Sequence, residues 1–353
     1  MERIIGKLLP WYEEHKRSLP WRQDRNPYHI WVSEIMLQQT RVEAVKPYYH
    51  RFMETLPTVQ ALAECPEEKL MKLWEGLGYY SRVRNMQKAA QQIMQEHGGI
   101  VPETKAQLEK LAGIGSYTAG AIASIAFEEA VPAADGNVFR IVSRLQMDSR
   151  DIMKQSVRKD MEAQLLSAMQ SYMWDSSSPG DFNQSLMDLG AGVCLPNAAP
   201  NCGICPLVDL CRAHAEGRET EFPVRTPKKP RRIEDRTILL IRDGERVVLH
   251  RRPEKGLLAG LYEFPNLEGT LKKEQALEQV AAMGLAALHI RPLDPAKHVF
   301  SHVEWHMIGY EIRVSAFPED GDVLSGGFLA EIGDVRERYS IPSAYRAYLD
   351  RLR

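Results

Sequence analysis

This chain of 353 residues lacks long apolar runs, contains few cysteines and has a net charge close to zero. No apolar run approaches the roughly 18 residues that a membrane-spanning helix needs. Residues 1–19 lack the long apolar core and the small-residue cleavage site of a signal peptide. We therefore expect a cytoplasmic protein without a membrane partner.

The net charge of −2 excludes a general electrostatic attraction to nucleic acid. Any DNA binding must come from local basic patches and backbone donors. With 44% hydrophobic and 26% charged residues, the composition is that of an ordinary globular protein. The length predicts two or three domains, each with a real core.

Helical periodicity dominates residues 1–220, as in the spacing of Leu70, Leu73, Trp74 and Leu77. Proline and basic residues then fill residues 221–236, which we expect to form an extended linker. Two interpretations of this linker stay open. It is either a solvated connector or a segment that contacts DNA phosphates.

Strand patterns begin after the linker. Ile238–Ile241 and Val247–Leu249 flank Asp243-Gly244, a sequence that predicts a β-hairpin. Further elements are expected as follows: strands at 297–305 and 307–314, and helices at 272–283 and from residue 343 to the end. The last third of the chain is therefore expected to be a separate α+β domain.

Four of the five cysteines crowd together, with the spacing Cys194-x7-Cys202-x2-Cys205-x5-Cys211. In a reducing compartment such a cluster predicts metal ligands rather than disulfides. Four thiolates suit either Zn²⁺ or a [4Fe–4S] cluster, and the compact spacing favours the iron cluster. The remaining cysteine, Cys65, is expected to be inert.

Two glycines in Gly113-Ile114-Gly115 lie between helical patterns. Glycines permit a tight turn and leave backbone N–H groups accessible. The next helix then points the positive end of its dipole at whatever binds. Such a hairpin can hold a DNA phosphate without basic side chains, although an isolated Gly-x-Gly is more often a simple turn.

Two carboxylates stand out against apolar surroundings. Asp135 precedes a predicted helix, so its simplest use is as the N-cap of that helix. Glu34 lies among Val32, Ile35 and Met36. If Glu34 is buried there, desolvation raises its pKa and suits it to general acid catalysis; if it is exposed, it is merely the polar flank of an amphipathic helix.

Together these motifs resemble the helix-hairpin-helix DNA glycosylases, and within them the MutY family of adenine DNA glycosylases. The resemblance covers essentially the whole chain. Besides the glycine hairpin, Asp135–Val138 and the four cysteines, it rests on three further motifs: Leu19–Arg22, Trp31–Val42 and Trp74–Arg82.

The resemblance implies a DNA N-glycosylase of base excision repair that excises adenine mispaired with 8-oxoguanine, and also with guanine. In this family Glu34 would protonate the leaving adenine. Asp135 would stabilise the oxocarbenium-like sugar or trap it covalently, and Asn137 would support the site. Tyr117 stands where strand-cutting relatives carry a lysine, which implies a monofunctional enzyme.

The resemblance also assigns binding residues. The adenine pocket would be lined by Arg17, Leu19, Trp21, Arg22 and Gln184. The DNA and 8-oxoguanine contacts would come from Gln39, Thr40, Leu77, Gly78, Tyr79, Gly113, Ile114, Gly115, Ser301 and His302. For His302 the alternative is a histidine with satisfied hydrogen bonds at a strand end, and for Trp31 and Trp74 we prefer core packing.

The family implies a helical catalytic region over residues 1–220. A six-helix barrel core spans about 28–136, and an iron–sulfur subdomain is built from 1–27 and 137–220. The Nudix-like domain over 237–353 would recognise 8-oxoguanine. It would lack hydrolase activity, because residues 272–285 offer Glu274 and Glu278 but no acidic cluster for Mg²⁺. The expected cofactor is [4Fe–4S], held by Cys194, Cys202, Cys205 and Cys211.

The chain departs from the family in one interval. Seven residues separate Cys194 from Cys202 where six are usual, so one extra residue is expected to loop out within 197–201. The expected partner is double-stranded DNA, bound by a monomer at the nucleoid. Three alternatives compete with this interpretation: a glycosylase/lyase for oxidised pyrimidines, a non-catalytic DNA-binding metalloprotein and a nucleotide-pyrophosphate hydrolase.

Overall fold

Two compact units make up the computed structural model, which describes residues 1–174, 177–196, 198–227, 230–317, 322–323 and 326–352. The helical unit comprises Met1–Cys65 and Arg82–Pro227, and the sheet unit comprises Pro66–Ser81 and Lys228–Arg353. The short segment Pro66–Ser81 therefore belongs with the C-terminal residues, although its neighbours in sequence belong to the helical unit.

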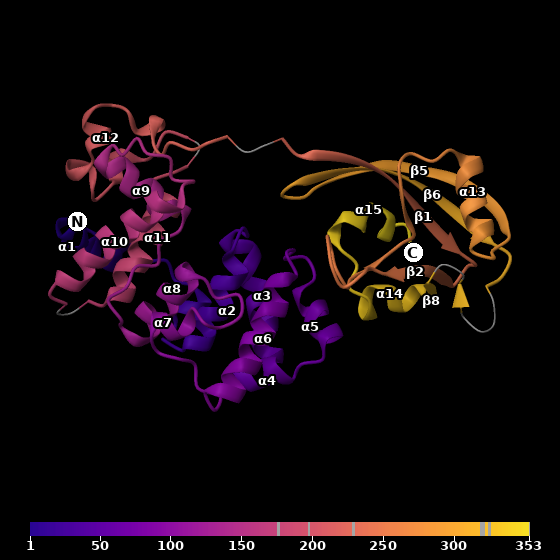
Figure 1. Cartoon of the computed structure of the whole chain (residues 1–353), viewed down its shortest axis with the longest axis horizontal. Helices are drawn as coiled ribbons and strands as arrows, with labels where there is room; N and C mark the ends of the chain where they lie inside the picture. Colours follow the sequence, from indigo (N-terminus) through magenta and orange to yellow (C-terminus); the bar gives the residue numbers. More distant parts are fainter. Residues whose placement is uncertain (175–176, 197, 228–229, 318–321, 324–325, 353) are drawn as a thin grey trace. The chain divides into compact units, whose positions relative to one another are not determined.

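Helices and short 3-10 turns build the helical unit, as predicted for this region (Figure 1). Its elements are α1 (Glu2–His15), η1 (Pro20–Arg22), α2 (Pro27–Leu37), α3 (Val42–Thr55), α4 (Val59–Glu64), α6 (Ser81–Glu96), α7 (Lys105–Leu108), α8 (Ser116–Phe127), α9 (Gly136–Gln146), α10 (Gln155–Ser171), α11 (Pro179–Gly192), η2 (Cys202–Ile204), η3 (Val208–Leu210), α12 (Arg212–Ala215) and η4 (Glu219–Glu221). None of the described helices combines the length and apolarity needed to cross a membrane.

Helix α11 connects several helices of the helical unit. It packs against α1, α8 and α9, while α2 packs against α8 (Figure 1). Its buried Leu186 shares one apolar core with Leu8 of α1, Ile141 of α9 and Leu165 of α10. This packing brings together residues that lie more than a hundred positions apart in sequence.

The sheet unit combines one mixed sheet with short helices. Its elements are α5 (Glu67–Trp74), β1 (Arg232–Arg242), β2 (Arg246–Arg251), β3 (Tyr262–Glu263), β4 (Asn266–Glu268), α13 (Lys273–Ala282), β5 (Ala287–Val299), β6 (Val303–Val314), β7 (Asp322–Val323), β8 (Gly327–Glu331), α14 (Ile332–Arg338), η5 (Ser343–Tyr345) and α15 (Arg346–Leu349). The strand order is β5-β6-β1-β2-β8-β7, with β3 paired to β2 and β4 paired to β1. The pair β1–β6 is parallel, and the other pairs are antiparallel.

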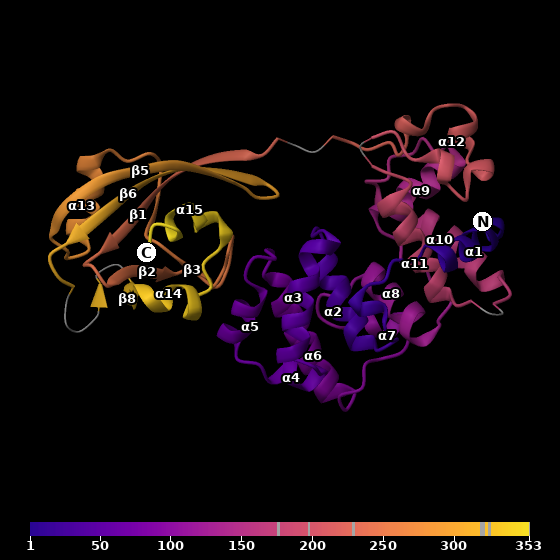
Figure 2. The ribbon, with the colours of Figure 1, turned by 180° about the vertical axis from the view of Figure 1, so that it is seen from behind.

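Strand β1 is buried on both faces, which explains its unbroken apolar run. Successive side chains of a strand point to opposite faces. Ile238 and Leu240 therefore pack into the core that contains Tyr348 of α15, and Leu239 and Ile241 pack into the core that contains Val280 of α13. Helix α13 covers one face of the sheet, and α14 and α15 cover the other (Figure 2).

The structure confirms the predicted hairpin and the helix over 272–283, and it corrects three other expectations. The predicted strand over 297–305 is wrong in its middle, because Phe300–His302 forms a turn in which the Phe300 N–H donates to the Val303 carbonyl at 2.8 Å. The predicted final helix is short and begins as the 3-10 turn η5. Strand β1 already begins at Arg232, so residues 232–236 of the expected linker lie in the sheet.

Candidate active site

Glu34 is a buried acid on α2, only 5% exposed. Its neighbours Val32, Ile35 and Met36 are buried as well. Burial, and secondarily the charge of Asp135, raise the pKa of Glu34 to about 7, against the lowering effects of a hydrogen bond from Tyr117 and the charge of Arg22. The buried interpretation of Glu34 is therefore confirmed, and the exposed flank is excluded.

Tyr117 lies in the first turn of α8 and meets Glu34 through a side-chain hydrogen bond. Burial, together with the nearby carboxylates, raises the pKa of this phenol well above its ordinary value. Tyr117 therefore keeps its proton at neutral pH and acts as the donor to the carboxylate of Glu34.

Asp135 is the N-cap of α9, as its position in the sequence predicts. Its Oδ1 accepts from the backbone N–H groups of Asn137 at 2.8 Å and Val138 at 3.0 Å. Its Oδ2 accepts from the Asn137 side chain at 2.7 Å. Donors thus surround the carboxylate and hold it in one orientation, so the cap and a role in the site do not exclude each other.

The segment that leads into Asp135 is fixed by residues that the sequence did not single out. The Asn183 side chain on α11 accepts from the Ala133 N–H at 3.0 Å and donates to the Val131 carbonyl at 2.9 Å. A Cβ added to Gly120 of α8 would lie 2.3 Å from the carbonyl oxygen of Pro132, so only glycine permits this approach.

A chain of hydrogen bonds connects Asp135 with the cysteine loop. Arg140 donates through Nη1 to the Asn137 side-chain oxygen at 2.8 Å and through Nε to the Cys194 carbonyl at 2.9 Å. Arg140 is almost fully buried. The asparagine that holds Asp135 is thereby tied to the backbone of the first cysteine of the cluster.

Two of the predicted pocket residues, Arg17 and Arg22, converge on Asp188 of α11. Arg17 Nε donates to Asp188 Oδ1 at 2.8 Å, and Arg22 donates to both carboxylate oxygens at 2.8 and 3.0 Å. Burial opposes ionisation of Asp188, but the two guanidinium groups lower its pKa overall. Leu19, Trp21 and Gln184 are also buried in this unit.

The predicted glycine hairpin forms the turn between α7 and α8. Gly113 has a φ of +74°, and a Cβ at this position would lie 2.6 Å from Asn85. Ile114 is buried, and Gly115 is the N-cap of α8 without a side-chain capping bond. The first N–H groups of α8 therefore have no capping side chain and can receive an anion.

Two protein-family models match separate parts of the chain. Residues 32–165 match the model of the HhH-GPD superfamily of base excision DNA repair proteins, and residues 237–351 match the NUDIX domain. The adenine DNA glycosylase of Rattus norvegicus is 38% identical, over 90% of this chain and 72% of its own length. The chain belongs to the adenine DNA glycosylases.

A second relative agrees with this assignment, and a solved structure shares the fold. The adenine DNA glycosylase of Homo sapiens is 36% identical over 85% of this chain, which spans 65% of the human protein. A solved thermostable thymine-DNA glycosylase, 24% identical, covers 61% of this chain and 96% of its own with a TM-score of 0.52. At that identity the solved structure shows the fold of the helical unit alone.

In this adenine DNA glycosylase the four clustered cysteines are free of disulfides and half-buried. Burial, and then the charges of Cys194 and Cys211 among others, raise the pKa of Cys205 to about 11. Arg144 Nη1 lies 3.2 Å from Cys194 Sγ. The four thiols are thus available to a metal cluster. Asn197, in the interval with the extra residue, lies outside the described residues.

The spacing of the sulfurs bears on the type of metal. Within the described part of the chain, one group of three metal-ligating side chains has all its ligand atoms within 4.8 Å of one another, namely Cys202, His214 and Glu219. No three of the four cluster sulfurs lie that close. A tetrahedral zinc ion with bonds of about 2.3 Å would hold its sulfurs about 3.8 Å apart.

The expected recognition residues lie at turns. Gln39 is exposed with a φ of +61°, and Tyr79 is 47% exposed with a φ of +47°, a conformation that side chains rarely adopt. Ser301 and His302 are exposed in the β5–β6 turn, and Ser301 Oγ lies 3.1 Å from His302 Nδ1. Trp31 and Trp74 are fully buried, as expected of core residues.

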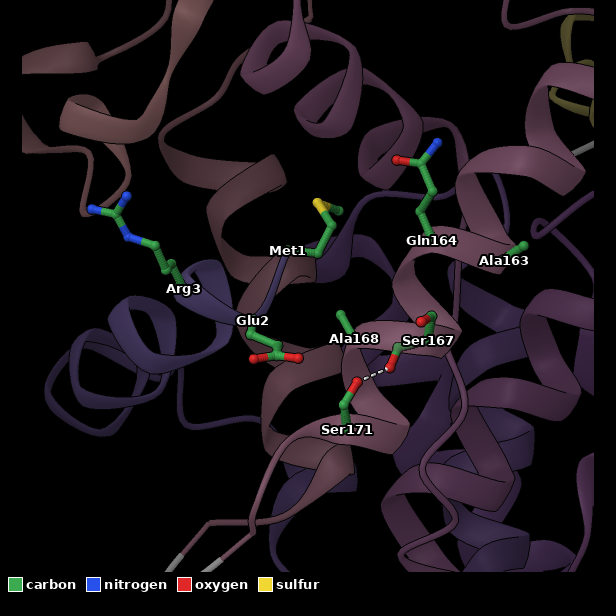
Figure 3. Close-up of a pocket in the computed structure, with 8 residues that line it drawn as sticks. All are labelled: Met1, Glu2, Arg3, Ala163, Gln164, Ser167, Ala168 and Ser171. Atoms are coloured by element: carbon green, nitrogen blue, oxygen red, sulfur yellow. Dashed lines mark hydrogen bonds between the residues drawn. The ribbon is translucent and has the colours of Figure 1, made fainter.

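Two other features lie apart from this site. A hollow of about 640 Å³ between the start of α1 and the face of α10 includes Met1, Gln164 and Ser171 (Figure 3), but none of the candidate catalytic residues. Glu274 and Glu278 are exposed on α13. No cation-binding group of carboxylates is found at α13 among the described residues.

Proposed function

We propose that this adenine DNA glycosylase excises adenine paired with 8-oxoguanine, and also adenine paired with guanine, from double-stranded DNA. The observation that carries the proposal is the buried carboxyl of Glu34, whose pKa lies at about 7. Near neutral pH roughly half of such carboxyls hold the proton that a departing base needs.

In this proposal the adenine first leaves the base stack, which costs less at a mispair. Glu34 then donates its proton to the leaving adenine. Asp135, held by Asn137 and the first N–H groups of α9, faces the cationic sugar and stabilises or traps it. Tyr117 donates to Glu34 and has no amine for a Schiff base, so the strand stays intact.

The remaining assignments concern binding. Arg17, Leu19, Trp21, Arg22 and Gln184 would line the adenine pocket, with Asp188 orienting the two arginines. The N–H groups at Gly113–Gly115 and the start of α8 would hold a phosphate. Gln39, Thr40, Leu77, Gly78 and Tyr79 would contact the strand that carries the damaged base, and Ser301 with His302 would recognise 8-oxoguanine.

We further propose that Cys194, Cys202, Cys205 and Cys211 bind a [4Fe–4S] cluster. The separation of their sulfurs supports a cage of several irons over a single zinc ion. When bound, the cluster would cross-link the loop and so support the Arg140 contact at Cys194. Purified protein should contain iron and absorb near about 400 nm; zinc without iron would contradict the assignment.

One assay tests the function and its rivals. The protein is incubated with a duplex that contains a single 8-oxoguanine:adenine pair and is then treated with alkali. Strand cleavage at the adenine after alkali alone is expected. Cleavage without alkali would indicate a lyase, and no cleavage would indicate a binding protein. We place the activity in the cytoplasm at the nucleoid, where a monomer would meet its substrate.

A further inference from the structure

Helix α5 is attached to the C-terminal residues of the sheet unit by a pair of side chains, Lys72 and Glu75. Glu75 Oε1 accepts from the backbone N–H of Ile341 at 3.0 Å, and Lys72 Nζ donates to the carbonyl of Tyr339 at 3.2 Å. The same two side chains form an ion pair at 2.6 Å. One charged pair thus holds the backbone on both sides of Ser340.

A second contact lies one turn earlier on α5. The Tyr262 hydroxyl donates to Glu68 Oε1 at 3.3 Å. Tyr262 is itself fixed, because it belongs to β3 and its ring packs edge-on against Tyr339, with 5.0 Å between ring centroids. We call these two contacts, through Glu68 and through Lys72–Glu75, the α5 clasp.

The α5 clasp ends at Glu75, directly before a loop that contains residues with positive φ. Glu75 is the C-cap of α5, and the loop Gly76–Tyr79 follows directly. Gly76, Gly78 and Tyr79 all have positive φ, and the Trp74 indole N–H donates to the Gly78 carbonyl at 3.0 Å. The conformation of the loop therefore depends on where α5 ends and how α5 is held.

We propose that Glu75 is a positioning residue for recognition of the damaged base. By holding Ile341, it joins the loop Gly76–Tyr79 to the C-terminal part of the compact unit that carries Ser301 and His302. The loop Gly76–Tyr79 and the turn at Ser301 and His302 are then already ordered when they bind DNA. A loop that had to be ordered on binding would lower the affinity for the 8-oxoguanine duplex most, because its conformational entropy would be lost at the step at which Ser301 and His302 engage the damaged base, and the guanine duplex lacks that base.

This inference rests on the proposed function, and it is tested with the full-length protein. Single-turnover excision is measured over a range of enzyme concentrations with 8-oxoguanine:adenine and guanine:adenine duplexes. E75A should raise the apparent Kd for the 8-oxoguanine duplex about tenfold, the usual effect of losing a charged hydrogen bond. The excision rate constant at saturation should change less than about twofold.

Two variants separate positioning from general stability. E75Q keeps an oxygen that accepts from Ile341, so it should restore most of the affinity that E75A loses. E13A removes a similar ion pair, Glu13 with Lys16 at 2.7 Å on α1, and should leave both Kd values unchanged. If E75A fails to fold, Y262F tests the other contact of the α5 clasp and should weaken binding to the 8-oxoguanine duplex selectively.

The outcomes are distinct. An unchanged Kd for E75A, or an equal rise for both duplexes, would overturn the positioning role. The same holds for Y262F where it replaces E75A. Wild-type protein that binds both duplexes equally would instead contradict the part of the proposed function that assigns recognition of 8-oxoguanine to Ser301 and His302.

Discussion

Glu34, the acid proposed for catalysis in the helical unit, is buried, whereas Ser301 and His302, proposed for recognition in the sheet unit, are exposed. Glu34 is 5% exposed and depends on its surroundings for a pKa of about 7. Ser301 and His302 lie open in a turn. Burial shifts the pKa of a group, but it also makes the stability of the fold depend on that group. An exposed group can be replaced with little change in stability. Substitutions in the two regions should therefore have separable effects.

The largest effect is expected from E34Q. Glutamine keeps the size of the side chain but has no proton to donate, so excision should fall about a thousandfold. Binding to the mispair should stay within about threefold, because the burial of the site is preserved. Single-turnover kinetics and equilibrium binding measure the two quantities. Near-normal turnover would show that another group supplies the proton.

Next in size is the effect of D188A on stability. Removing this carboxylate leaves the largely buried Arg22 without its ion-pair partner, so the free energy of unfolding should fall by about 3–4 kcal/mol. Urea denaturation measures the change. The control is D209A, which removes a solvent-exposed pair with Lys7 and should destabilise the protein far less. Equal losses in the two variants would contradict the structural role of Asp188.

The pH dependence of stability offers a further test of Glu34. Its pKa rises from 4.5 in its ordinary state to about 7 in the fold. Between these values the folded protein holds a proton that the unfolded chain has lost, so stability falls as pH rises through this window. E34Q has no carboxyl to titrate, so its stability does not fall in this way. The free energy of unfolding of E34Q minus that of wild type should increase by about 3 kcal/mol from pH 4 to pH 8. A constant difference would contradict the raised pKa.

The smallest effect is expected from S301A in the exposed turn. Loss of one neutral hydrogen bond should reduce the preference for 8-oxoguanine:adenine over guanine:adenine about fivefold. Stability should change by less than about 0.5 kcal/mol. Competition between the two duplexes in one reaction measures the preference. A thousandfold loss of all excision would place this turn in the chemistry instead.

Sequence patterns correctly predicted the features that are determined by residues close together in the sequence. The capping role of Asp135, the glycine turn at Gly113 and the hairpin strand at Ile238–Ile241 follow from spacing and residue type. The burial of Glu34 was undecided from the sequence, because a mostly apolar helix can still expose one face. Packing of α2 against α8 decided it.

Long-range partners could not be predicted in this way. Asp188 and Asn183 look like ordinary polar residues of α11, and their importance comes from partners fifty or more positions away in the sequence. The run at 297–305 reads as one strand, since nothing in Phe300–His302 resembles a glycine turn. A contact between two residues far apart in the sequence produces no periodic pattern from which it could be predicted.

The division of Pro66–Ser81 from its sequence neighbours has a consequence for synthesis. Lys72 and Glu75 leave the ribosome long before their partners Tyr339 and Ile341, which follow them in the sequence by 267 and 266 residues respectively. At about 5–20 residues per second, this gap corresponds to roughly a quarter of a minute to a minute of translation. An eight-residue helix such as α5 is too short to be stable alone. The sheet unit is therefore completed only after residues 339–341 have been made, and a truncation before residue 339 removes the partners of an early segment as well as its own residues.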